Sequence, residues 1–197
     1  MSELVVGSLA GLSDNGFVID VASGSSLDLS NGATLPAGSI VDVQSVLKTD
    51  TFSASVAGSG NTAVTDLSIT HTLKNSSNKL LIMAFFGVAA STANRANVGI
   101  AIADDGSLIG IGDAAGSRVR VAAGGQVNNV DDSGVVAMPH IHLVYSPGDT
   151  NSHTYTVRAI NINASTHTLY VNQTASGTDS ASLSRGASAI TIQEVAA

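Results

Sequence analysis

The order of apolar and polar residues predicts a series of short β-strands from residue 39 onward. Around residue 70, Leu67, Ile69 and His71 alternate with Ser68 and Thr70, and a period of two places alternate side chains on opposite faces of a strand. An apolar stripe with helical spacing does not persist anywhere in the sequence. The predicted strands cover residues 40–47, 51–56, 64–73, 80–89, 98–103, 108–109, 118–121, 135–145, 154–162, 168–172 and 189–195.

The stretch 80–89 is nearly continuously apolar, which is typical of a strand buried on both faces at the centre of a sandwich. We assign its Phe85-Phe86 pair to the core for the same reason. Turn-forming residues at 58–61, 74–78 and 104–106 separate the strands, at the spacing of a β-sandwich or barrel. The predicted fold class is therefore all-β.

The first 38 residues differ from the rest of the chain. Glycines separate short apolar pieces such as Phe17–Ile19 and Leu27–Leu29, and pieces this short cannot build a core of their own. We expect residues 1–38 to form an extended N-terminal arm that packs on a neighbouring subunit or on the main domain. Residues 39–197 then form the β-sandwich domain. A loose terminus is the alternative, and the apolar pieces favour docking.

The composition agrees with a protein made of strands and turns. Of 197 residues, 44% are apolar and only 12% are charged, against about 25% charged in average proteins. Glutamate occurs only at positions 3 and 194, and lysine only at 48, 74 and 79. These residue types solubilise exposed helices, so their scarcity disfavours long surface helices.

The net charge of −7 disfavours nucleic-acid binding, because binding phosphates requires clustered lysine and arginine. Arg118 and Arg120 would share one strand face, as a solvated face or a subunit contact. The sequence has no cysteine, which excludes disulfides and thiolate metal sites. We expect no signal peptide and no membrane insertion, because residues 1–6 lack a basic start and the longest apolar stretch, 80–90, is too short to span a bilayer.

Seven segments between residues 39 and 197 carry the most characteristic runs of the sequence. They are Ile40–Phe52, Leu67–Ile82, Leu108–Gly116, Ser146-Pro147, Thr154–Val157, Leu169–Asn172 and Ala189–Glu194. In this order they resemble a domain that recurs in bacteriophage virion and tail-fibre proteins, notably of marine phages. Residues 22–31 are similar to leader segments of phage fibres.

The resemblance implies a jelly-roll-like antiparallel β-sandwich that works in a virion, usually as a homotrimer and without catalysis. It implies no catalytic residues and no cofactor. The expected partners are further copies of the chain, and other virion proteins through residues 1–38. The protein is then made in the host cytoplasm and located in the virion. Tail fibre, tail tip and capsid decoration all stay open as its place in the particle.

The sharpest chemical feature is the sequence His140-Ile141-His142. Residues two apart on a strand face the same side, so both imidazoles could converge on one ion. Three such pairs on a threefold axis would offer six nitrogens to a transition metal, an arrangement that resembles the metal-bound tips of some phage fibres. The alternative is a strand face with ordinary hydrogen bonds. Two ligands alone are a weak metal motif, so we assign no metal site and keep His140 and His142 as candidates.

Other motifs point to turns rather than to chemistry. Gly110–Gly116 nearly spells a dinucleotide fingerprint, but its last gap is too long and a strand is predicted to follow it. The pairs Asp104-Asp105 and Asp131-Asp132 each lead into a glycine. Adjacent strand residues point to opposite faces, so neither pair suits acid–base catalysis. His71, His153 and His167 have no ligand-like spacing and are assigned to polar strand or turn positions.

Two further functions have less support from the sequence than a structural role. A receptor- or glycan-binding module at a fibre tip usually offers aromatic platforms, and this chain has no tryptophan, three tyrosines and four phenylalanines. A polysaccharide hydrolase requires a nucleophile or a carboxylate pair, and no Gly-x-Ser-x-Gly elbow is present. The sequence therefore predicts a non-enzymatic structural protein first, a binding module second and an enzyme last.

Overall fold

The computed structural model describes residues 35–91, 96–127, 136–176, 180–181 and 183–197, and these ranges contain strands and no helix. The predicted all-β class is confirmed. The strands are β1 (Ile40–Lys48), β2 (Phe52–Val56), β3 (Asn61–Thr72), β4 (Lys79–Phe85), β5 (Val88–Ala90), β6 (Ala96–Asp104), β7 (Ser107–Ile109), β8 (Ala123–Val127), β9 (His140–Tyr145), β10 (Ser152–Asn161), β11 (His167–Val171) and β12 (Ser188–Val195).

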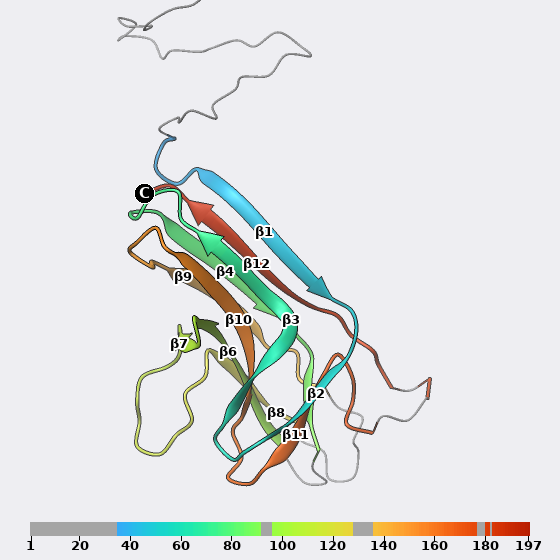
Figure 1. Cartoon of the computed structure of the whole chain (residues 1–197). Coiled ribbons are helices and arrows are strands. Elements are labelled where there is room, and N and C mark those ends of the chain that lie inside the picture. The colour runs from blue at the N-terminus through green and yellow to red at the C-terminus, as the bar shows by residue number, and fades with distance from the viewer. Residues whose placement is uncertain (1–34, 92–95, 128–135, 177–179, 182) are drawn as a thin grey trace, which may run out of the picture. The chain divides into compact units, whose positions relative to one another are not determined.

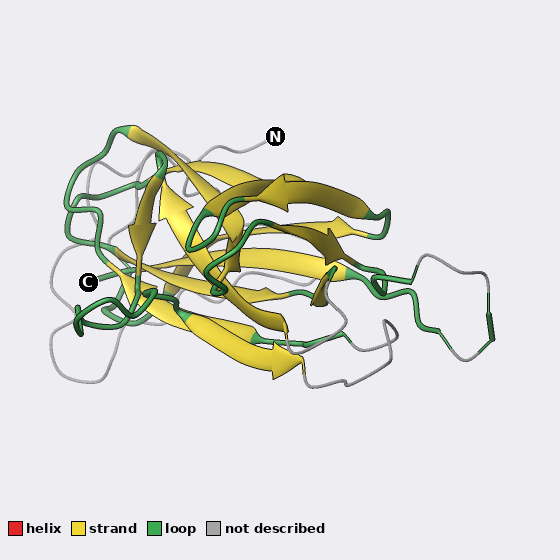
Figure 2. Ribbon diagram, turned by 90° about the horizontal axis from the view of Figure 1, so that it is seen from below, coloured by secondary structure: helices red, strands yellow, loops and turns green. Residues whose placement is uncertain are grey.

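Two larger sheets and one small sheet make up the sandwich (Figure 1). The first sheet has the order β1-β12-β4-β9, and the second has the order β3-β10-β6-β7 with β8 also paired to β6. The small sheet, β2-β11-β5, is built from strands that lie between those of the two larger sheets along the chain. Figure 2 shows the layers from a second direction.

The pairing is that of one long hairpin wrapped on itself. In the larger sheets β1 pairs β12, β3 pairs β10, β4 pairs β9 and β6 pairs β7, all antiparallel. The first strand thus pairs with the last, the second with the second last, and so on inward. Such nesting, with the chain passing between two facing sheets, is the jelly-roll arrangement. The expected jelly-roll-like sandwich is therefore confirmed.

The core lies between the two larger sheets and follows the predicted alternation. On β12 Ile190 and Ile192 are buried, and on β3 Leu67 and Ile69 are buried. Burying an isoleucine or leucine side chain contributes about 1.5–3 kcal/mol. Inward-facing aliphatic side chains from both sheets form one continuous cluster with Tyr155.

Three predicted strands differ from the observed ones. The stretch 80–89 is divided into β4 and β5, because the chain leaves the first sheet at Gly87 and enters the small sheet at Val88. A side chain at Gly87 would lie 2.9 Å from Val136. The continuous apolar run therefore belongs to two sheets, each of which has a buried side.

The predicted strand 118–121 is a loop, and its alternating Arg-Val pattern misleads. The amide of Arg118 bonds back to Ala115, and the amide of Gly112 bonds to Val121, so this segment closes on itself instead of joining a sheet. The predicted turn role of the preceding glycines is confirmed, since Gly110 and Gly116 both have a φ of 61°. The strand β8 follows this loop and was not predicted.

The predicted strand 135–145 begins only at His140 within the described residues. Pro139 has no N–H to donate to a ladder, so the strand starts after it. Residues 128–135, including the Asp131-Asp132 pair, lie outside the described residues. No helix in the described part of the chain is long and apolar enough to cross a membrane.

The segment that leads into β1 is attached to the end of β12. The amide of Gly38 donates to Ala196 at 2.8 Å, and the amide of Ala196 donates to Ser39 at 2.9 Å. Residues 35–197 form one compact unit. Residues 1–34 lie outside the described residues, so the extended arm over 1–38 and its boundary stay a prediction.

Candidate functional site

The outward side of the first sheet is the most unusual surface of the described chain. Register places Leu47, Ala189, Phe85 and His140 in one row across the four strands. We call this side the apolar face. Its members are Ile40, Val43, Ser45 and Leu47 of β1, Ala189, Thr191, Gln193 and Val195 of β12, Lys79, Leu81, Met83 and Phe85 of β4, and His140, His142 and Val144 of β9.

Large apolar side chains on this face are open to solvent. Leu47 and Val144 are each 64% exposed, and Val43 is 53% exposed. Among the described strand residues, every exposed large hydrophobic side chain belongs to this sheet: Ile40, Val43, Leu47, Phe85 and Val144. Contiguous exposed apolar surface on a soluble domain marks a place where something binds.

The prediction for the Phe85-Phe86 pair is half right. Phe86 is fully buried, but Phe85 is 38% exposed on the apolar face and lies beside the His140 ring, with ring centroids 6.3 Å apart. The two phenylalanines differ because successive strand residues point to opposite faces. The apolar run of β4 therefore has one side in the core and one side facing out.

A hollow of about 370 Å³ lies on the apolar face. Small side chains of Ala189 and Thr191 on β12 and larger side chains on β4 and β9 line it. The residues that line it are Met83, Ala84, Phe85, His140, Ile141, His142, Ala189 and Thr191. The hollow gives the face a recess beside projecting side chains.

The two candidate metal ligands are placed on this face. His140 and His142 are both exposed, while Ile141 between them is buried, so the predicted common side is confirmed. Among the described residues, one cluster contains three potential metal ligands, namely Asp104, Asp105 and His153. Neither His140 nor His142 belongs to it. Within one chain the pair thus supplies two ligands. No metal site is assigned, and His140 and His142 stay candidates.

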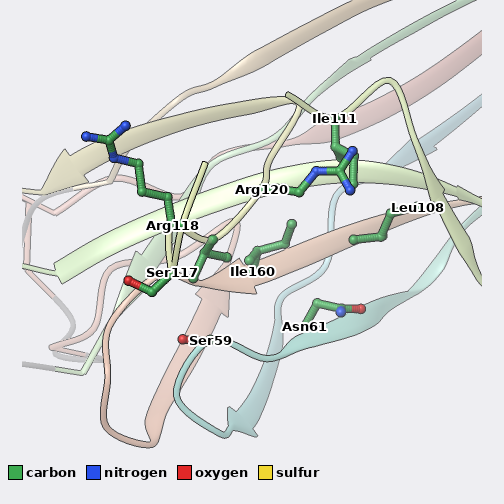
Figure 3. Close-up of a pocket in the computed structure, with 10 residues that line it drawn as sticks. Ser59, Asn61, Leu108, Ile111, Ser117, Arg118, Arg120 and Ile160 are labelled. Carbon is green, nitrogen blue, oxygen red and sulfur yellow. The ribbon is translucent and has the colours of Figure 1, made fainter. Parts of the chain in front are cut away.

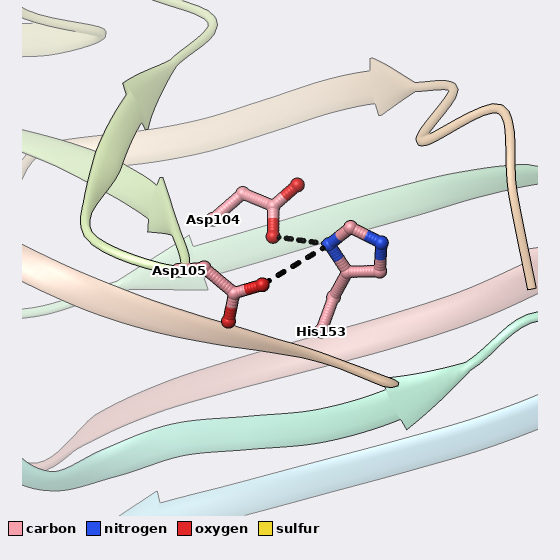
Figure 4. A group of neighbouring side chains, drawn as sticks. All are labelled: Asp104, Asp105 and His153. Carbon is pink, nitrogen blue, oxygen red and sulfur yellow. Dashed lines mark hydrogen bonds and ion pairs between the residues drawn. The ribbon is translucent and has the colours of Figure 1, made fainter. Parts of the chain in front are cut away.

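A second group of interest surrounds His153 at the start of β10 (Figure 4). Its Nδ1 lies 2.8 Å from Asp104 Oδ1 and 3.4 Å from Asp105 Oδ2, and its Nε2 lies 3.0 Å from Asp149 Oδ1. The hydroxyl of Tyr145 donates to the other oxygen of Asp104 at 2.8 Å. Both ring nitrogens of His153 therefore face carboxylates.

These contacts favour a protonated histidine. Hydrogen bonds to Asp149 and then to Asp104 raise the pKa of His153, because each carboxylate stabilises the imidazolium. The amide of Asn151 and then the His153 ring lower the pKa of Asp149. Burial and the hydrogen bond to Asp104 raise the pKa of Tyr145 to about 12. The group is a charge-paired clamp between the β6–β7 turn and the β9–β10 loop.

The sequence-based expectation for Asp104 and Asp105 was wrong in one respect. Both carboxylates reach the same nitrogen, although adjacent strand residues point apart. The reason is that Asp104 ends β6 and Asp105 begins the turn, with a φ of 45° followed by 90° at Gly106. This is the left-handed geometry that suits a tight hairpin turn, and the turn itself was predicted.

A third group joins the two larger sheets inside the sandwich. Glu194 on β12 is fully buried, and its Oε2 lies 2.9 Å from Nε2 of His71 on β3. Its Oε1 accepts from the amide of Lys74 at 2.7 Å and from the side chain of Asn78 at 2.6 Å. Gln44 on β1 contacts the other ring nitrogen of His71 at 3.2 Å. Both carboxylate oxygens are satisfied, so this group is structural.

The assignment of His71 and His153 to simple polar positions was therefore incomplete. The sequence contained one signal for the buried group. His71 lies an even number of positions from the buried Leu67 along its strand, and Glu194 from the buried Ile192, so both point to the core. It contained no signal for the clamp, because His153 and Asp104 are far apart in the chain and meet only through strand pairing.

Arg118 and Arg120 lie at a second hollow of about 370 Å³. Figure 3 shows their side chains leaving the loop in different directions, so the prediction that they share one strand face was wrong. Arg120 donates to the carbonyl of Gly112. Polar groups of Ser59 and Asn61 line the same hollow, together with the apolar side chains of Leu108, Ile111, Val119 and Ile160. This hollow combines cationic, polar and apolar groups.

Comparisons with known proteins assign the chain to no family. No protein-family model matches it, and no curated protein matches it. It is similar to a chain in the structure of infectious bursal disease virus, Gx strain, with a TM-score of 0.41 and 16% identity over 87% of this chain. For the Gt strain of the same virus the TM-score is 0.39, again with 16% identity over 87% of this chain. This chain spans 42% of the viral chain in each case.

Proposed function

We propose that this chain is a non-enzymatic structural protein of a virion, a tail fibre or related surface component, that assembles as a homotrimer. The observation that carries the proposal is the apolar face on a jelly-roll sandwich, because a soluble domain with open Leu, Val and Phe side chains on one whole sheet is built to be covered by protein. The likeness of residues 39–197 to phage virion proteins supplies the virion context.

Two sets of paired ionisable residues support a structural role. Glu194 and His71 are buried and bond to each other, and His153 is held between carboxylates on both sides. Groups that are already paired in this way stabilise the fold, whereas a catalytic base has to reach a substrate. In this proposal residues 1–38 form the arm that holds neighbouring subunits or other virion proteins.

Three measurements test this function. Light scattering on the purified full chain should give three chain masses at micromolar concentration, and labelled antibody should decorate intact particles. A monodisperse monomer would overturn the trimer, and particles without label would overturn the virion location. Release of oligosaccharides from bacterial surface polysaccharide by the pure protein would contradict the non-enzymatic role.

A second candidate is a receptor-binding module for an acidic glycan, and the hollow with Arg118 and Arg120 favours it. Arginine binds carboxylates well, and Ser59 and Asn61 could bind sugar hydroxyls. Binding of the full chain to a glycan array should then favour sialylated or uronic acid-containing glycans. Loss of that binding in Arg118→Ala, with unchanged thermal stability, would support this candidate, and an array without any signal would remove it.

A further inference from the structure

We infer that the apolar face is the surface by which copies of this chain bind one another. The inference rests on the proposed homo-oligomer and adds which of its surfaces makes the contact. Its occupant is a further copy of the same chain, on three grounds: the extent of the face, its charge and its shape.

The extent of the face requires a broad partner. Four strands about 4.8 Å apart and about seven residues long give a footprint of roughly 19 Å by 23 Å. An extended segment of chain covers only the width of about one strand, so it would leave most of the face open. Sheets of neighbouring copies can cover it fully, since packed sheets lie about 10 Å apart. In a trimer the face of each copy then meets two neighbours around the threefold axis.

The area also limits the kind of contact. The footprint is roughly 400 Å², which is about half of the roughly 800 Å² that each partner contributes to a standard interface. The face therefore supplies the apolar centre of the interface, and surface beyond these four strands supplies the rest. Within the face, the exposed apolar Leu47 and Val43 lie on the edge strand β1. The exposed His140 and His142 lie on the opposite edge strand β9 and can provide a polar rim.

The charge of the face fits a copy of the same chain. The chain contains 15 acidic residues and has a net charge of −7, so two copies repel each other wherever their acids meet. None of the residues that define the apolar face is acidic, and Lys79 is its only lysine or arginine. A strongly charged partner would find almost no complementary charges here, whereas the same face of another copy brings no acidic residue and one lysine.

The shape of the face offers both exposed side chains and a recess. Leu47 and Val144 on the two edge strands are each 64% exposed, and the hollow of about 370 Å³ extends from Ala189 and Thr191 on β12 to His140 and His142 on β9. A surface that carries both a projection and a recess can fill the recess of one copy with the projection of another. Burial of these side chains in the assembly removes the exposed apolar surface that a monomer would show.

The decisive experiment is light scattering on the full chain with a charge placed on the face. Leu47→Asp and Val144→Asp should each weaken association at least 100-fold and give monomers at micromolar concentration. Ser68→Asp, an exposed strand position on β3 of the other sheet, is the matched control and should leave the oligomer intact. Circular dichroism confirms that each variant is folded. If an Asp variant fails to fold, Val144→Thr keeps the branched shape and should weaken association about tenfold.

The outcomes separate the two levels of the proposal. A monomeric wild type overturns the proposed homo-oligomer, and this inference with it. A wild-type oligomer that both Asp variants and Val144→Thr leave unchanged overturns only the inference, because copies then meet elsewhere.

A labelling experiment identifies the occupant directly, since the chain has no native cysteine. The thiol of Val144→Cys should react with a maleimide at least tenfold more slowly than that of Ser68→Cys at concentrations where the oligomer forms, and equally fast after dilution to monomers. Protection that persists in the monomer would assign the face to a segment of the same chain and would overturn the inference.

Discussion

The two sheets of the sandwich share one core but have opposite outward sides. On the first sheet the outward residues include Leu47, Val43, Phe85 and Val144, all exposed and apolar. On the second sheet the outward residues of β3 and β10 include Ser68, Thr70, Thr72, Ser152, Thr154, Thr156 and Arg158. Thr70 and Thr154 lie opposite each other with their hydroxyls 3.1 Å apart.

The comparison shows that the inward and outward sides of a strand meet different requirements. Most inward residues of both sheets are aliphatic because the core requires it, and the inward Glu194 and His71 bond to each other. Outward residues are free to suit water or protein, so the hydroxyl-rich side of β3 and β10 is a solvent face, and the apolar side of the first sheet is suited to a protein partner. Four stability measurements test whether these assignments hold.

The largest loss of stability is expected at the buried hydrogen bonds that join the two larger sheets. Glu194→Ala leaves the side chains of His71 and Asn78 and the amide of Lys74 without their buried acceptor, and should lower the free energy of unfolding by about 3–5 kcal/mol. Urea denaturation measures the change. Gln193→Ala, one residue earlier on the outward side of β12, is the control and should cost less than about 1 kcal/mol. Equal losses would contradict the division into inward and outward sides.

The next effect concerns the core below the apolar face. Ile192→Ala removes a fully buried side chain of β12 and should cost about 2–4 kcal/mol through lost burial and the cavity left behind. Thr191→Ala, its outward neighbour, should cost less than about 1 kcal/mol in a monomer. Both values come from chemical denaturation at low protein concentration. If Thr191→Ala were the more damaging change, β12 would face the core with its other side.

The charge clamp should make the stability of the domain depend on pH. Because the folded pKa of His153 is raised above its ordinary value of about 6.5, its contribution is complete below pH 6.5 and is lost as the pH rises through the folded pKa. Asp149 has a lowered pKa, so its share is present above its ordinary pKa and is lost as the pH falls through the folded value.

Thermal unfolding from pH 4 to pH 9 measures this dependence. His153→Gln should be less stable than the wild type at pH 6, and the difference should shrink at pH 9. His167→Gln, whose parent ring contacts only the carbonyl of Ser91 among the contacts described, is the control without carboxylate partners. A constant difference between His153→Gln and wild type across the range would show that the ion pairs do not contribute.

The smallest effect is expected on the solvent face. Ser68→Lys places a charge on an exposed strand position of β3 and should change the free energy of unfolding by less than about 0.5 kcal/mol. Association measured by light scattering should also be unchanged. A large loss in either measurement would show that the hydroxyl-rich side is covered in the assembly, and the contrast between the two faces would no longer hold.

The fold was largely predictable from local pattern, because a period of two directly encodes which side of a strand is buried. That is why the strands around Leu67 and Ile190 were found nearly at their observed bounds. The break at Gly87 was hidden by apolar residues on both sides of it, and the loop at Arg118 was mistaken for a strand because its side chains alternate. Hydrogen bonds from Gly87 and Val88 to the distant Asn172 and Ala137 decide the break, and bonds within residues 112–121 close the loop, and neither set of bonds can be read from the alternation.

The candidate sites were less predictable than the fold. The common side of His140 and His142 follows from strand geometry and is confirmed. The clamp around His153 required the hairpin turn at Asp105 and the pairing of β6 with β10 before its groups could meet. The apolar face was concealed in the same way, because a doubly apolar strand such as β4 gives the same pattern whether its second side meets another layer or lies open.

By itself, then, the sequence determined an all-β chain with inward aliphatic residues and scarce charge, since alternation and composition are local properties. The tertiary structure decided which residues from distant strands share a surface. Strand order placed β1, β12, β4 and β9 side by side and thereby gathered Leu47, Phe85 and Val144 on one exposed face. Long-range hydrogen bonding sets that order, and no local window of sequence carries it.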